Sequence, residues 1–233
     1  MASVTKSGMI DTAAVQAAPC ALSGMTTLLR RALDRTCAKR FGLVVVTGPG
    51  AERTLTALAE RGADTWGRLD SRASLDQALE AAEQSLIAAH ADGEDAISTL
   101  FDLRRLASDR FALAAMLRLV LAQRTAPRLC GACRQPEQAY GSVSALLGLD
   151  PGAILWSAPG CEECAGTGQL GALSIFEGVE VDPAMRRLLY DGADAPLLAR
   201  HAFLTLPNLA AAARGLARDG MIAPEHAVRI SRG

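Results

Sequence analysis

The chain has 233 residues and a formal net charge of −1, and half of its residues are hydrophobic although only 4% are aromatic. This length can bury a sizeable core in one large or two small domains, and the near-zero charge excludes a global field that would recruit nucleic acid or acidic lipid. No apolar run approaches the ~18–20 residues of a membrane span, and the N-terminus lacks the apolar segment of a secretory signal. We therefore expect a cytoplasmic protein.

The abundance of alanine and leucine predicts that helices outweigh strands. Residues 1–20 are expected to form a loose lead-in, and residues 23–39 show helical spacing with Ser23 as the N-cap. The β-branched apolar run at 43–47 predicts a buried strand. Further along the chain we expect helices at 54–61, 74–83, 94–106 and 111–124, a strand at 85–89, and short helices at 183–189, 195–201, 209–219 and 224–230.

The stretch GLVVVTGPGAERTLTAL at 42–58 is similar to a phosphate-binding loop, G-x-x-x-x-G-K-[ST], in which backbone amides and a lysine hold the phosphates. Gly48 and Gly50 supply the turn, but the loop is one residue short and Arg53 stands where the lysine belongs. Thr54 would bind Mg²⁺ in an intact loop, whereas here we expect it to cap the next helix. These four residues are the candidate nucleotide-binding residues, and we do not expect ATP and Mg²⁺ to be cofactors.

Four of the six cysteines form two C-x-x-C pairs, namely Cys130, Cys133, Cys161 and Cys164. In a cytosolic chain, paired C-x-x-C turns favour four thiolates around one tetrahedral zinc ion over disulfides. Gly131 and Gly166 would permit the tight turns. The alternative, a redox C-x-x-C, needs only one pair at a helix start in a thioredoxin-like unit, which is not visible here. Four cysteines leave no open position on the metal, so the zinc is expected to be structural.

Three stretches, GLVVVTGPGAERTLTAL at 42–58, AQRTAPRLCGAC at 122–133 and GCEECAGTGQLGALSIFE at 160–177, resemble motifs of one family. The chain resembles the C-terminal ATPase domain of type II secretion and type IV pilus assembly ATPases, the GspE/PilB class. The resemblance covers 22–58 and, in order, 67–229. It implies an α/β fold with a reduced RecA-like (P-loop NTPase-like) core, a tetracysteine zinc subdomain, a helical C-terminal tail and a hexameric ring.

This resemblance divides the chain into four parts: a loose N-terminal segment at 1–21, a degenerate RecA-like core at 22–127, the zinc subdomain at 128–177 and the helical tail at 178–233. We expect no counterpart here of the N-terminal domains that dock such ATPases on the inner-membrane platform.

The chain also departs from the family. Several dozen residues, including an acidic catalytic box and arginines that reach a neighbour's nucleotide, are reduced to 55–66. The Walker B signature GEIRD is replaced by GRLDS at 67–71, with Arg68 in the acidic position. Asp70 is the alternative, a shifted Walker B acid. The family's LSTLHTNDA box survives mainly as His90, which fits a structural histidine better than a sensor.

Phosphoryl transfer depends on positioning and on neutralising the charge of the transferred group. With the phosphate cradle shortened and the acid and arginines missing, we assign no catalytic residue. The resemblance then implies a pseudo-ATPase, a zinc-stabilised interaction or regulatory component of a type II secretion or type IV pilus system. The alternative is a nucleotide-binding ATPase subunit completed by residues of a neighbouring chain in a mixed ring.

The expected partner is an intact secretion or pilus assembly ATPase, or a second copy of this chain. The contact is expected on the face beside 67–74 and on the helix at 111–124, because a shortened core exposes surfaces that the missing segment would cover. The alternative is a core that closes over itself as a stable monomer. Contact with nucleic acid is not expected, and contact with the membrane is expected only indirectly, through a secretion platform.

Overall fold

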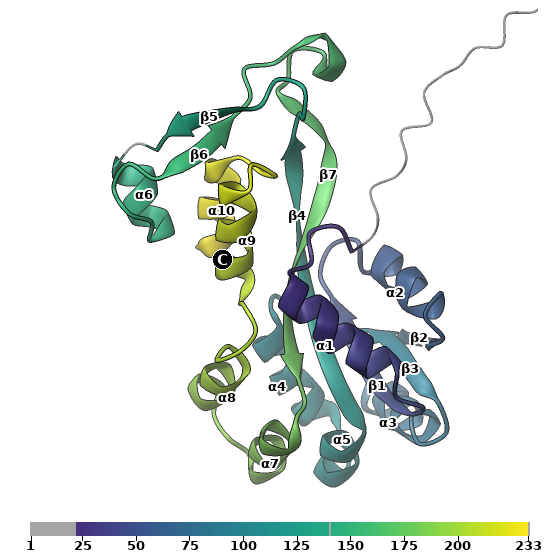
Figure 1. The fold of residues 1–233 in the computed structure, drawn as a ribbon. Helices are drawn as coiled ribbons and strands as arrows, with labels where there is room; N and C mark the ends of the chain where they lie inside the picture. Colours follow the sequence, from purple (N-terminus) through teal and green to yellow (C-terminus); the bar gives the residue numbers. More distant parts are fainter. Residues whose placement is uncertain (1–21, 140, 233) are drawn as a thin grey trace, which may run out of the picture.

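The computed structural model of the chain describes residues 22–139 and 141–232, so the lead-in expected at 1–20 lies outside it (Figure 1). A five-stranded sheet with the order β2-β3-β1-β4-β7 forms its centre. The strands are β1 (Gly42–Thr47), β2 (Asp64–Arg68), β3 (Leu86–His90), β4 (Leu117–Leu129) and β7 (Gln169–Glu180). The first four run parallel to one another, and β7 lies antiparallel beside β4.

Helices cover both faces of this sheet. Because successive side chains of a strand point to opposite faces, Val45 of β1 belongs to one hydrophobic cluster and Val44 to the other. The face of Val44 is covered by α1 (Thr27–Cys37) and α2 (Ala51–Ala59). The face of Val45 is covered by α3 (Arg72–Ala81), α4 (Ala96–Leu106), α5 (Arg110–Met116), α7 (Pro183–Asp191) and α8 (Ala195–Ala202).

The strands β4 and β7 extend past the sheet as an antiparallel ribbon, which rises from the core in Figure 1. The part beyond the sheet contains β5 (Gln135–Gln138), α6 (Gly141–Leu147), β6 (Ile154–Ser157) and a short 3-10 helix (Glu162–Cys164). Two further helices, α9 (Leu209–Arg218) and α10 (Pro224–Ser231), lie beside the ribbon. They share a third hydrophobic cluster with β6 and β7, so this part of the chain has a core of its own.

Most elements lie where the sequence places them. The strand expected at 43–47 is β1, the strand expected at 85–89 is β3, and the four short helices expected after residue 182 are α7 to α10. The first helix begins later than expected. Its N-cap is Thr26 rather than Ser23, because the Thr26 hydroxyl accepts the Leu29 amide at 3.4 Å.

The prediction of a buried helix at 111–124 is wrong. The helix α5 ends at Met116, and the chain continues directly as β4 from Leu117. The first seven residues of β4 are all buried, because helices cover both faces of the sheet at this strand. These seven residues are mostly apolar and do not alternate with polar ones, so the pattern does not distinguish a buried strand from a buried helix.

Candidate functional site

The loop between β1 and α2 is held tightly against β4. Gly48 and Gly50 have positive φ angles of 96° and 80°, which L side chains rarely adopt. A Cβ atom on Gly48 would lie 2.1 Å from the carbonyl oxygen of Gln123, so only glycine fits there. The turn that resembles a phosphate-binding loop is therefore present, and its backbone lies against β4.

The side chain of Gln123, in β4, forms hydrogen bonds with two polar groups of this loop. Thr54 donates its hydroxyl hydrogen to Gln123 Oε1 at 2.6 Å, and Gln123 Nε2 donates to the Pro49 carbonyl at 2.5 Å. Thr54 is 1% exposed and Gln123 is fully buried. The expectation that Thr54 caps the helix is wrong, because α2 already begins at Ala51 and the hydroxyl is bound to Gln123.

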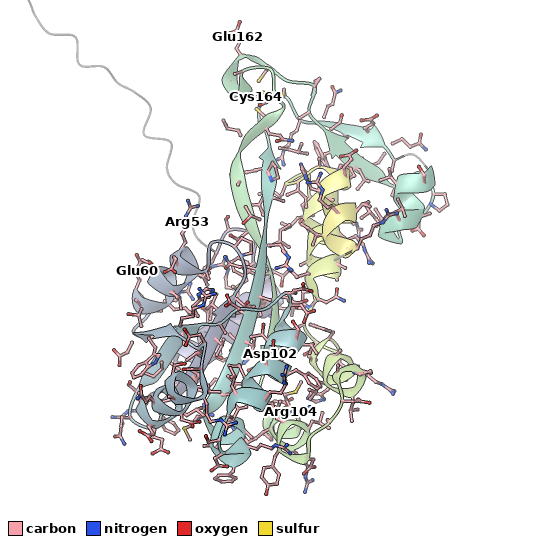
Figure 2. All side chains as sticks on the ribbon, turned by 180° about the vertical axis from the view of Figure 1, so that it is seen from behind. Arg53, Glu60, Asp102, Arg104, Glu162 and Cys164 are labelled. Atoms are coloured by element: carbon pink, nitrogen blue, oxygen red, sulfur yellow. The ribbon has the colours of Figure 1, made fainter. Side chains whose placement is uncertain are left out.

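The basic residue of the loop lies apart from this arrangement. Arg53 is exposed on the outside of α2, where Figure 2 labels it. Among residues 22–139 and 141–232 it makes no ion pair. The structure therefore brings Gly48, Gly50 and Thr54 together around Gln123, and it leaves Arg53 in solvent.

The residues in the Walker B region are engaged with one another at the surface. Arg68 ends β2 and forms an exposed ion pair with Asp92, and this hydrogen bond lowers the pKa of the Asp92 carboxyl. Asp70 is exposed and accepts a long hydrogen bond, 3.4 Å, from the Ser74 hydroxyl. His90 is half-buried at the end of β3, and its carbonyl accepts the Leu69 amide at 2.7 Å. This contact is made by the backbone and does not involve the imidazole, so the role of the His90 side chain stays a prediction.

The four cysteines of the C-x-x-C pairs meet at the far end of the β4–β7 ribbon. Their sulfur atoms all lie within 4.8 Å of one another. The sulfur–sulfur distances are 3.8 Å for Cys130–Cys161, 4.0 Å for Cys133–Cys164 and 3.8 Å for Cys161–Cys164. Four sulfurs at about 2.3 Å from one ion in a tetrahedron lie about 3.8 Å apart. The observed distances match this arrangement and are far longer than a disulfide bond, so the cluster can hold a metal ion.

Backbone amides prepare one of these thiols for metal binding. The amides of Cys161 and Gly168 donate to Cys164 Sγ at 3.1 and 3.2 Å, and they lower the pKa of this thiol to about 6. A thiolate is the form that binds metal, so the hydrogen bonds favour the binding species. Figure 2 labels Cys164 at the end of the molecule away from the sheet.

The glycines of the two cysteine turns are used differently. Gly166, after the second pair, has a positive φ angle of 77°, whereas Gly131, in the first pair, does not have one. Gly160 and Gly168 also have positive φ angles. A Cβ on Gly160 would lie 2.3 Å from the Gly166 carbonyl oxygen, and one on Gly168 would lie 2.2 Å from a backbone oxygen. The second turn therefore depends on glycine at three positions.

The structure contains a buried acid, Glu177, that the sequence does not predict. Glu177 ends the third motif, is 3% exposed and accepts hydrogen bonds from the amides of Ala96 at 2.7 Å and Leu209 at 2.8 Å. These are the first residues of α4 and α9, whose unpaired amides attract a carboxylate. Burial is the largest influence on this group, and it raises the pKa of Glu177. Glu177 thus joins the sheet-covering helix α4 to the helix α9 of the C-terminal part.

None of the helices in the described ranges combines the length and the apolar character needed to cross a bilayer.

The sequence comparisons identify relatives among secretion and pilus proteins. Type II secretion system protein E of Pseudomonas aeruginosa is 34% identical over 139 residues, covering 59% of this chain and 28% of that protein. Its namesake in Klebsiella pneumoniae is 26% identical over 264 residues, covering 89% of this chain and 52% of that protein. The type IV pilus assembly ATPase PilB of Myxococcus xanthus is 31% identical over 113 residues, covering 46% of this chain and 20% of that protein. The chain therefore spans about half of these relatives or less.

Solved structures share the fold at low identity. The ATPase DotB of Yersinia pseudotuberculosis has a TM-score of 0.62 at 13% identity, covering 92% of this chain and 63% of that chain. The pilus retraction motor PilT has a TM-score of 0.55 at 15% identity, covering 86% of this chain and 64% of that chain. Residues 69–229, more than half of the chain, match the family described as Type II/IV secretion system protein. This chain belongs to that family.

Proposed function

We propose that the protein is a non-catalytic component of a type II secretion or type IV pilus system, with a reduced RecA-like core that has lost ATP hydrolysis. The observation that carries this proposal is the hydrogen bond of Thr54 to Gln123. In a working phosphate loop the corresponding hydroxyl binds Mg²⁺. Here Thr54 is 1% exposed, and its hydroxyl already donates its hydrogen to a buried side chain.

Two further observations support the loss of catalysis. Arg53 is exposed rather than turned toward the loop, and a guanidinium is a poor substitute for the compact ammonium that binds β- and γ-phosphates. Arg68, in the position of the Walker B acid, brings a positive charge that is paired with Asp92. Each missing group of this kind costs a phosphoryl-transfer enzyme orders of magnitude in rate.

We propose that the ion held by the four cysteines is a structural zinc. Thiolates in a closed tetrahedral set are the ligands of structural zinc sites, and no position is left for a water or substrate. Such an ion would fix the far end of the β4–β7 ribbon, where only a few residues separate the cysteines from the strands.

Without ATP hydrolysis, the function of the protein would be to bind other proteins in the cytoplasm. The partner we propose is an intact secretion or pilus assembly ATPase, or a second copy of this chain. The part of the expected contact surface at 117–124 is withdrawn, because this segment lies mostly buried in the sheet. The remaining candidates are the face beside 67–74, which begins at the end of the exposed edge strand β2, and the exposed side chain of Phe111.

Calorimetry with ATP and Mg²⁺ tests this proposal, first with the protein alone and then with an intact ATPase of the same cell. We expect no heat of ATP binding that distinguishes the natural chain from the Thr54→Ala variant, and a measurable heat with the intact ATPase. ATP turnover clearly above that of Thr54→Ala would favour the mixed-ring ATPase instead.

A further inference from the structure

The turn between α9 and α10 lies against the first cysteine pair. Arg128, two residues before Cys130, forms an antiparallel backbone bridge with Ile222. The Leu129 amide donates to the Met221 carbonyl at 3.0 Å. In Figure 1, α9 and α10 lie beside the ribbon, on the side of β6. The segment that enters the cysteine site is thus hydrogen-bonded to the segment that joins the last two helices.

The side chain of Arg134 binds the same turn. Arg134 follows Cys133 directly, and its amide donates to the Cys130 carbonyl at 3.0 Å, so its backbone belongs to the first cysteine turn. Its Nη1 atom donates to the Gly220 carbonyl at 2.7 Å and to the Asp219 carbonyl at 3.4 Å. These carbonyls lie at the C-terminal end of α9, where the helix leaves carbonyls unpaired and carries partial negative charge. A guanidinium is therefore well suited to this position.

Trp156 of β6 completes the contact with α9. The guanidinium carbon of Arg134 lies 5.1 Å from the centre of the Trp156 ring, and the ring Nε1 donates to the Arg218 carbonyl at 3.1 Å. Gly220 has a positive φ angle of 66°, and a Cβ atom there would lie 2.6 Å from Trp156 Cγ. Arg134 and Trp156 together bind the carbonyls of residues 218, 219 and 220, which are consecutive in the chain.

The guanidinium of Arg134 takes its position from the cysteine turn. Within the described ranges Arg134 forms no ion pair, and its side chain contacts α9 and Trp156. An ion held by the thiolates would fix Cys130 and Cys133, and with them the backbone that carries Arg134. Two sites that bias the same segment are coupled, and the coupling acts equally in both directions. An ordered cysteine turn therefore favours the docked position of α9, and docked α9 favours metal binding.

We propose that metal occupancy of the cysteine site controls how firmly α9 and α10 are docked, with Arg134 as the positioning residue that connects the two. This inference rests on the proposed zinc site and extends it to helices that contain none of its cysteines. The Leu209 amide at the start of α9 binds Glu177, which also binds the Ala96 amide of α4. A metal-dependent change in α9 therefore reaches a helix that covers the sheet.

Hydrogen exchange followed by mass spectrometry tests this coupling in the full chain, with zinc added and after its removal by a chelator. In the natural chain, removal of zinc should speed exchange at 209–231 as well as at 128–177. In Arg134→Gln, exchange at 209–231 should already be fast with zinc bound and should change much less on removal. The matched control is Arg128→Gln, because the exposed side chain of Arg128 is not needed for its backbone bridge with Ile222. This control should behave as the natural chain.

The zinc affinity gives the reciprocal measurement. Competition with a chromophoric chelator should show that Arg134→Gln binds zinc at least about fivefold more weakly than the natural chain, whereas Arg128→Gln binds it equally. Both variants lose one positive charge from the same segment, so their difference separates the contact with α9 from the general effect of charge on the thiolates. If Arg134→Gln fails to fold, Trp156→Phe takes its place. This variant removes the donor to the Arg218 carbonyl and should make exchange at 209–231 less dependent on zinc.

The outcomes separate the coupling from the metal site on which it rests. A chain that binds no zinc would overturn the proposed metal site and the coupling together. Zinc binding without any response at 209–231 would overturn the coupling alone. An equal response in Arg134→Gln and in the natural chain would show that Arg134 does not transmit it. Weaker zinc binding in Arg134→Gln without a change at 209–231 would reduce its role to an electrostatic effect on the thiolates.

Discussion

The carboxylate of Glu177 accepts the backbone amide of Leu209 at 2.8 Å, across 32 residues of chain. The same carboxylate accepts the amide of Ala96, so one side chain satisfies the starts of two helices. This contact connects the sheet to the C-terminal helices through a single buried group.

We expect Glu177→Gln to lower the free energy of unfolding by about 1–3 kcal/mol, because its amide group replaces one acceptor oxygen with a donor that faces a backbone donor. Urea unfolding followed by circular dichroism measures this loss. The control is Glu180→Gln, which removes a partly exposed ion pair and should cost less than about 1 kcal/mol. Equal losses in the two variants would contradict the role given to Glu177.

The buried hydrogen bonds of Gln123 to the loop lead to a second prediction about stability. Gln123→Leu leaves the Thr54 hydroxyl and the Pro49 carbonyl without their partner, so the chain should lose about 1–3 kcal/mol of stability. The double variant Gln123→Leu with Thr54→Val should recover part of this loss, since it removes the orphaned hydroxyl. Chemical denaturation of both variants checks this, and no recovery in the double variant would show that the hydroxyl is satisfied in another way.

The proposed zinc site predicts both the metal content of the protein and the stability of the segment that carries the cysteines. Protein purified without chelator should contain one zinc ion per chain, and Cys161→Ser should reduce that content and speed hydrogen exchange in residues 128–177. Cys37→Ser, which changes a cysteine outside the cluster, should alter neither quantity. Metal analysis that finds well under one zinc per natural chain would refute the site.

Restoring the lysine should not restore catalysis. In Arg53→Lys the loop remains one residue short and Thr54 remains bound to Gln123, so ATP hydrolysis should stay at the level of Thr54→Ala. A coupled phosphate-release assay measures both variants. Turnover in Arg53→Lys clearly above this control would show that the arginine alone disables the loop.

The pH dependence of stability should reflect His226 in α10. Burial, and after it the charge of Arg229, lowers the pKa of His226 below its ordinary value, so the unfolded chain binds its proton more readily. The contribution of His226 is therefore present above about pH 6.5 and is lost as the pH falls through its lowered value. Urea midpoints at about pH 5 and about pH 7.5 should differ less in His226→Gln than in the natural chain. An unchanged difference would assign the pH dependence to other groups.

The sequence predicts those features that depend on local pattern or on repeated ligands. The strand at 43–47 has a short β-branched run, and the cysteine cluster follows from two C-x-x-C pairs with the spacing of a four-thiolate metal site. Gln123 and Glu177 were missed because their contacts join residues 69 and 81 positions apart, and a lone polar residue in an apolar run gives no sign of its partner. The division of the chain at 21, 127 and 177 stays a prediction.

The strand β4 belongs at once to the sheet and to the cysteine-bearing end. Its ladder with β7 runs from Leu119 to Leu129, and the register shifts between Pro127 and Leu129. Because proline has no amide hydrogen, the ladder is weakest near the cysteine end of the ribbon, five residues beyond Ala122, the last residue of β4 that pairs with β1. Bending force applied at the cysteines would thus concentrate at Pro127, while the segment up to Ala126 would carry tension to Gln123 and the loop. The two strands therefore act as one stiff ribbon that bends most easily at Pro127.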